Sequence, residues 1–117
     1  MAFDRVGNIY VGDQGCNNGI QVFTAEGQFL WKIGRKGRGR GELNFPTGIY
    51  IDRDDAMYIS EFNNNRVSVF TTEGIYLTSF GTKGSGQGQF NNPAGLAVDK
   101  DGFIYVSDCN NRRIQIF

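Results

Sequence analysis

Apolar and polar residues alternate along this chain in short segments of four to six residues. Residues 56–61 (Ala-Met-Tyr-Ile-Ser-Glu) and 103–108 (Phe-Ile-Tyr-Val-Ser-Asp) show the pattern, and Gly, Asn and Asp lie between such segments. Alternation of this kind is typical of β-strands with one buried face, joined by tight turns. Seventeen glycines and sixteen aromatic residues agree with many short strands. The pattern therefore predicts an all-β fold.

The strand pattern repeats with a fixed period. Phe23, Phe70 and Phe117 each end an alternating segment and are 47 residues apart. The predicted strands are residues 2–4, 8–13, 20–23 and 28–33, then 48–52, 56–61, 67–70 and 75–80, then 95–99, 103–108 and 114–117. Four antiparallel strands followed by a longer return are typical of propeller blades. The chain therefore divides into a first blade at residues 1–47, a second at 48–94 and a partial third at 95–117.

The longest connections, residues 34–47 and 81–94, both contain Gly-x-Lys-Gly-x-Gly-x-Gly and then Pro46 or Pro93. They look like phosphate-binding loops. However, they lack the Gly-Lys-Ser/Thr ending and a following helix, whose N-terminus would stabilise a phosphate. This argues against a nucleotide site.

The repeat resembles the NHL family of β-propellers. The resemblance rests on Phe-x-x-Pro-x-Gly-Leu-x-Val-Asp at residues 90–99 and on Asn-x-Arg-(Ile/Val)-x-(Ile/Val)-Phe at 64–70 and 111–117. Within the family, the chain looks most like the propellers at the C-terminus of tripartite-motif ubiquitin ligases. The resemblance implies an NHL-type, non-catalytic interaction module, with ubiquitin transfer left to a RING domain outside these residues. The first repeat departs from the pattern, because Gly19 stands where Arg66 and Arg113 stand in the later repeats.

Eleven predicted strands amount to about 2.75 blades, whereas the family resemblance implies a ring of about six. An incomplete ring leaves two open blade faces with unpaired strand edges. We therefore expect either a piece of a longer protein or a protomer of a homo-oligomer that completes the ring with another copy.

The chain has no net charge, with twelve basic and twelve acidic residues, but the charges separate by turn. Successive connections of an antiparallel meander alternate between the two ends of the strands. The turns between second and third strands therefore share one face with the long connections, and this basic face has eight cations against four carboxylates, a net charge of +4. Its cations are Arg35, Lys36, Arg38, Arg40, Arg66, Lys83, Arg112 and Arg113. The opposite face has a net charge of −5, so we expect an anionic partner on the basic face.

Two arginines of the basic face follow acidic residues closely. We predict that Glu61 pairs with Arg66, and Asp108 with Arg113, across the turn between second and third strands. The other cations are candidates for holding phosphates, above all the cluster at residues 35–40. The alternative is a solvated basic loop without a ligand.

Single-stranded RNA is bound through stacked bases and base edges as well as phosphates. Phe62, Asn64 and Asn111 are the residues that we expect to approach bases, beside Lys83 and Arg112. Two alternatives stay open, since Phe62 can fold back over its blade and asparagines are good turn formers. A second function also stays open, namely a protein scaffold that binds a partner on the same face or assembles through its open blade edges.

The composition argues against catalysis. There is no histidine, and the two cysteines, Cys16 and Cys109, are isolated, so we expect no catalytic residue, metal or cofactor. Both cysteines are expected as free thiols in a reducing, cytoplasmic compartment, since a disulfide would need their turns to meet. No apolar run approaches the length of a membrane span.

Overall fold

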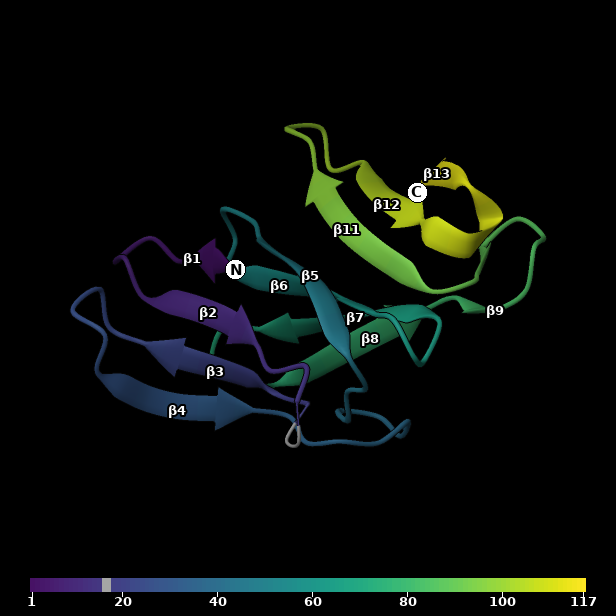
Figure 1. Ribbon diagram of the computed structural model, residues 1–117. Coiled ribbons are helices and arrows are strands. Elements are labelled where there is room, and N and C mark those ends of the chain that lie inside the picture. The colour runs from purple at the N-terminus through teal and green to yellow at the C-terminus, as the bar shows by residue number, and fades with distance from the viewer. Residues whose placement is uncertain (16–17) are drawn as a thin grey trace.

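The computed structural model describes residues 1–15 and 18–117 and is all-β, as the sequence predicts (Figure 1). The first sheet contains β1 (Ala2–Phe3), β2 (Ile9–Gly12), β3 (Ile20–Phe23) and β4 (Phe29–Ile33), and the second contains β5 (Pro46–Ile51), β6 (Ala56–Glu61), β7 (Arg66–Thr71) and β8 (Tyr76–Phe80). The third contains β11 (Pro93–Val98), β12 (Ile104–Asp108) and β13 (Arg113–Ile116), with the 3-10 turn η1 (Cys109–Asn111) before β13. Each sheet is an antiparallel meander in chain order, which is the arrangement of a propeller blade.

The long connections contain two short strands that the sequence pattern does not predict. These are β9 (Thr82–Lys83) and β10 (Gln89–Phe90), which pair in parallel. The connection closes on itself because the Gly84 N–H donates to the Phe90 carbonyl at 3.0 Å. The earlier connection closes in the same way, with Gly37 donating to the Leu43 carbonyl at 3.0 Å. The two connections therefore have the same backbone closure.

The three sheets pack side by side around their first strands. Strand β5 contacts β1 and β2 on one side and β11 on the other. Figure 1 shows the sheets following one another from the purple and blue first sheet to the yellow-green third. Within the described ranges, no helix has the length and apolar character needed to cross a bilayer.

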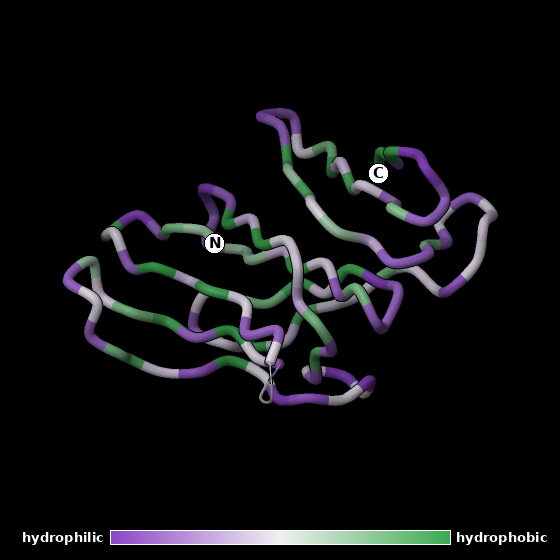
Figure 2. Tube along the Cα trace, in the orientation of Figure 1, coloured by the Kyte–Doolittle hydropathy of each residue, from purple (hydrophilic) through white to green (hydrophobic). Residues whose placement is uncertain are grey.

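Apolar residues of neighbouring sheets form two cores, each completed by one residue from a long connection. Leu43 belongs to the core between the first and second sheets, and Phe90 packs with Val67 and Val106 between the second and third. Both are fully buried, which stabilises the fold by roughly 1.5–3 kcal/mol for each side chain. Figure 2 shows apolar segments along the strands and polar segments in the turns and connections. Each connection is thus anchored near its end, while its glycine-rich part stays at the surface.

Candidate functional site

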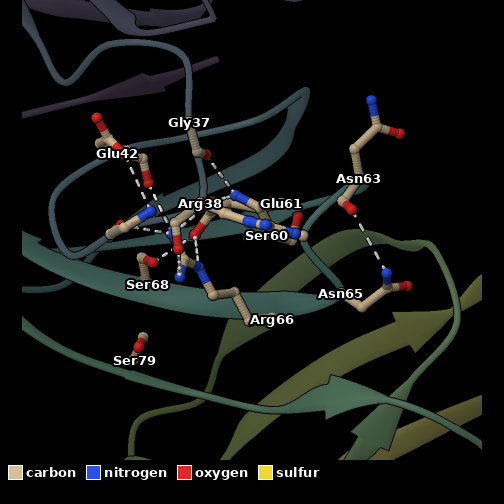
Figure 3. A network of polar contacts seen from close by, with 12 residues as sticks. Gly37, Arg38, Glu42, Ser60, Glu61, Asn63, Asn65, Arg66, Ser68 and Ser79 are labelled. Atoms are coloured by element: carbon tan, nitrogen blue, oxygen red, sulfur yellow. Dashed lines mark hydrogen bonds and ion pairs between the residues drawn. The ribbon is translucent and has the colours of Figure 1, made fainter.

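Arg66 joins the second sheet to the connection that precedes it. Its Nε, at the start of β7, donates to Oε2 of Glu61 at 2.8 Å. Nη1 donates to the Arg38 carbonyl at 2.8 Å, and Nη2 donates to the carbonyls of Gly39 at 3.0 Å and Glu42 at 2.8 Å. Figure 3 shows the guanidinium between Glu61 and the backbone of the connection. A planar guanidinium with five donors suits this set of acceptors, so Arg66 fixes the backbone of the glycine-rich loop.

Arg113 makes the same contacts one repeat later. Its Nε donates to Oδ2 of Asp108 at 2.9 Å. Its two terminal nitrogens donate to the carbonyls of Ser85 at 3.0 Å, Gly86 at 2.8 Å and Gln89 at 3.0 Å. We call each arginine with its carboxylate an arginine clasp. In both clasps the carboxylate is fully buried, so the arginines serve the structure of the loops and add no free charge to the basic face.

Asn64 and Asn111 reinforce the two clasps. Each donates through Nδ2 to one loop carbonyl and to the carboxylate of its clasp. The distances are 2.8 Å and 2.7 Å from Asn64 to Gly37 and Glu61, and 2.8 Å and 2.9 Å from Asn111 to Gly84 and Asp108. From the sequence, these two side chains are expected to approach RNA bases. In the structure, both Nδ2 groups donate to acceptors within the chain, as is common for asparagines in turns.

Arg35 has an acidic partner of its own. Its Nε lies 3.0 Å from Oε2 of Glu42, while the Arg35 side chain is 80% exposed. Oε1 of Glu42 also accepts the Gly39 N–H at 3.0 Å. The backbone hydrogen bond, followed by the bond from Arg35, lowers the pKa of Glu42. Glu42 is therefore ionised at neutral pH and balances the charge of Arg35.

Five other cations of the basic face are exposed, and within residues 1–15 and 18–117 they have no ion-pair partner. These five exposed cations are Lys36, Arg38, Arg40, Lys83 and Arg112. The clasps and the Arg35–Glu42 pair have no net charge. The positive potential of the basic face therefore comes from the five exposed cations.

Phe62, in the turn between β6 and β7, is half-buried and packs against a second aromatic ring. Its ring centroid lies 5.5 Å from that of Phe45, and its N–H donates to the Phe45 carbonyl at 3.0 Å. Phe45 is not among the site residues predicted from the sequence. Comparing the repeats would have pointed to Phe45, because the equivalent residue 47 positions later is not aromatic but Asn92.

Comparison with known proteins places this architecture in a family. A model described as a 6-bladed β-propeller matches residues 3–64, which is more than half of the chain, and an NHL repeat model matches residues 90–117. The chain belongs to the 6-bladed β-propeller family. Both matches agree with an NHL-type propeller, which the sequence motifs suggest. No curated protein matches the sequence significantly.

Solved structures similar to this propeller are much longer than the chain. They include a protein of unknown function from Bacteroides thetaiotaomicron VPI-5482, with a TM-score of 0.78, 20% identity, and coverage of 94% of this chain and 32% of that one. An auxiliary nutrient binding protein from the same organism has a TM-score of 0.69, 17% identity, and coverage of 93% and 34%. A streptogramin B lyase has a TM-score of 0.68, 15% identity, and coverage of 97% and 38%. The chain thus spans about a third of each of these proteins, and at such identities the similarity shows the fold alone.

On the opposite face of the propeller, a repeated aspartate closes the turn between first and second strands. Asp4 accepts the Tyr10 hydroxyl at 3.0 Å, and Asp99 accepts the Tyr105 hydroxyl at 2.9 Å. Desolvation, and then the hydrogen bond to Asp4, raise the pKa of Tyr10. Oδ1 of Asp4 also accepts the Asn8 N–H at 2.9 Å, and Oδ1 of Asp99 accepts the Phe103 N–H at 3.0 Å, so these aspartates hold their turns.

The structure describes one of the two cysteines. Cys109 is a free, exposed thiol in η1. Cys16 lies outside the described residues, so the prediction that it is a free thiol stays a prediction.

Proposed function

We propose that this propeller is a non-catalytic binding module whose basic face binds the phosphates of single-stranded RNA. The observation that carries the proposal is the group of five exposed cations without an acidic partner in the described part of the chain. Phosphates are the natural partners of such a surface, because releasing their counterions drives binding. In a tripartite-motif ubiquitin ligase, the same face would serve substrate recognition.

The two long connections give an internal comparison that supports this role. Arg38 and Arg40 occupy the positions that Ser85 and Gln87 occupy one repeat later. Arginine clasps hold both connections by equivalent carbonyl groups. The second connection has the same backbone closure with Lys83 as its only cation. The charges at Arg38 and Arg40 are therefore not needed to form the loop, which leaves them free to bind a ligand.

The apolar surface favours a nucleic acid over a protein as the partner. Protein interfaces depend on a few large apolar or aromatic side chains at their centre. The large apolar side chains that are more than a third exposed lie in the strands and in the remaining turns and ends. Among the described residues, the long connections and the turns at 61–66 and 108–113 contain none of them. A surface with charge and little exposed apolar area suits a phosphate backbone.

The test exchanges side chains between the two connections. Arg38→Ser with Arg40→Gln gives the first loop the residues of the second loop at these two positions. Binding of a labelled single-stranded RNA is followed by fluorescence anisotropy over a range of salt concentrations. Each phosphate contact contributes about 0.7 to the slope of log K against log salt for single strands, so the slope should fall by up to about 1.4. The reverse exchange, Ser85→Arg with Gln87→Arg, should steepen the slope.

The matched control neutralises two exposed cations on the opposite face. Arg53→Gln with Lys100→Gln removes the same charge and should leave the slope unchanged. An unchanged slope in the Arg38→Ser, Arg40→Gln protein, with its far-ultraviolet circular dichroism intact, would overturn the proposal. Tight binding of an acidic peptide without binding of RNA would favour the protein scaffold instead.

A further inference from the structure

Phe45 has a backbone conformation that bulky residues disfavour. Its φ is +58°, in the left-handed region, where Cβ crowds the following carbonyl. The conformation is held from both sides. The Phe45 N–H donates to Oδ1 of Asn18 at 2.7 Å, and the Phe45 carbonyl accepts the Phe62 N–H at 3.0 Å.

The next repeat shows that this turn does not require an aromatic residue. Asn92 occupies the equivalent position with φ +57°, and its N–H donates to Oδ1 of Asn65 at 2.8 Å. Asparagine tolerates the left-handed region much better than phenylalanine does. Strained backbone of this kind occurs preferentially at functional sites. The aromatic side chain of Phe45 is therefore the feature that needs an explanation.

The rings of Phe45 and Phe62 form an aromatic pair. The ring centroids are 5.5 Å apart with an interplanar angle of 49°, and both side chains are half-buried, so part of each remains accessible. The turn that contains Phe62 also contains Asn64, whose Nδ2 holds the carbonyl of Gly37 at 2.8 Å. Gly37 precedes Arg38 in the chain. One short turn thus connects the aromatic pair to the cationic loop.

Building on the proposed RNA binding, we propose that Phe45 and Phe62 form a platform on which a nucleobase of the bound strand stacks, while Arg38 and Arg40 hold neighbouring phosphates. Stacking uses the π-face that every base has, so it needs no donors to base edges. The Asn64 amide could not easily supply such donors, because its two protons already bond to the Gly37 carbonyl and the Glu61 carboxylate. The basic face would then distinguish RNA from a simple polyanion.

The test compares two ligands of equal charge on the unmodified chain. One is a short oligouridylate, and the other is an abasic oligonucleotide of the same length. Stacking of one base should make the oligouridylate bind roughly 5- to 150-fold more tightly. Phe62→Leu keeps apolar packing against Phe45 but removes one aromatic face, so it should reduce this preference without changing the salt slope. Phe62→Trp should restore it.

The repeat supplies a variant for the strained position. Phe45→Asn copies Asn92, fits the left-handed backbone, and should abolish the preference for bases. Equal affinity of the unmodified chain for both ligands would overturn the platform and leave phosphate binding standing. Failure to bind either ligand would overturn the proposed function itself. The ligand comparison needs no variant, so it stays decisive if Phe45→Asn does not fold.

Discussion

Nε of Arg66 lies 2.8 Å from Oε2 of Glu61, and the Glu61 side chain has no exposed surface. The same guanidinium donates to three carbonyl groups of the preceding connection. One side chain thereby compensates a buried charge and shapes a surface loop. The stability of the blade and the position of the loop cations are therefore coupled through Arg66.

Replacing Arg66 should destabilise the fold strongly. Arg66→Met keeps much of the side-chain volume but leaves the Glu61 carboxylate buried without its cation. Breaking a buried pair in this way typically lowers the free energy of unfolding by about 3–5 kcal/mol. Urea denaturation measures the change.

The control for this variant is Lys36→Met, which removes an exposed cation without an ion-pair partner in the described ranges. Its effect should stay within about 0.5 kcal/mol, as is usual for surface substitutions. A loss below ~1 kcal/mol for Arg66→Met would show that Glu61 does not depend on this arginine.

The free energy of unfolding should fall in acid, because protonation removes the stabilising interactions of carboxylates that are hydrogen-bonded in the folded state. Desolvation raises the pKa of Asp108, but hydrogen bonds from the Asn91 N–H and from the Asn111 and Arg113 side chains outweigh it and hold the pKa below its ordinary value. The pKa values of Asp4 and Asp99 are lowered as well, by turn amides and tyrosine hydroxyls that outweigh desolvation.

A carboxyl whose pKa is lowered by folding stabilises the folded state above its unfolded pKa, about 3.9 for Asp, and loses that contribution as pH falls through the folded value. The free energy of unfolding should therefore be level between about pH 7 and 5 and decline below about pH 4. Urea denaturation over this range measures it. Asp108→Asn should flatten the decline, and an unchanged acid profile in that variant would contradict the assigned pKa.

Strand positions follow from the sequence because alternation and turn residues act locally. Residues 56–61, predicted from alternation alone, coincide with β6. The pair β9 and β10 was not predicted, since two-residue strands leave no periodic pattern and depend on the closure of the connection. Local pattern is thus sufficient for the blades and insufficient for the loops between them.

The site was harder to predict because it depends on contacts between distant parts of the chain. Sequence proximity suggests an ion pair between Glu61 and Arg66, but nothing local shows that Arg66 also binds three carbonyls more than twenty residues away. Gly19, which replaces this arginine in the first repeat, is explained only in three dimensions. A Cβ there would lie 2.7 Å from the Ile33 carbonyl oxygen and 2.9 Å from that of Gly34.

The third sheet should promote association between copies of the chain. Ile114 and Ile116 on β13 are 66% and 60% exposed, whereas their counterparts Val67 and Val69 on β7 are 0% and 6% exposed. Strand β13 is also an edge of its sheet, and unpaired edges with apolar side chains favour pairing with another chain.

Light scattering after size exclusion should show a mass above that of one chain that rises with concentration. Ile114→Lys with Ile116→Lys should return it to one chain, whereas Val6→Lys, at an exposed residue in a turn, should not. A single-chain mass for the unmodified protein at every concentration would show that these side chains do not drive self-association.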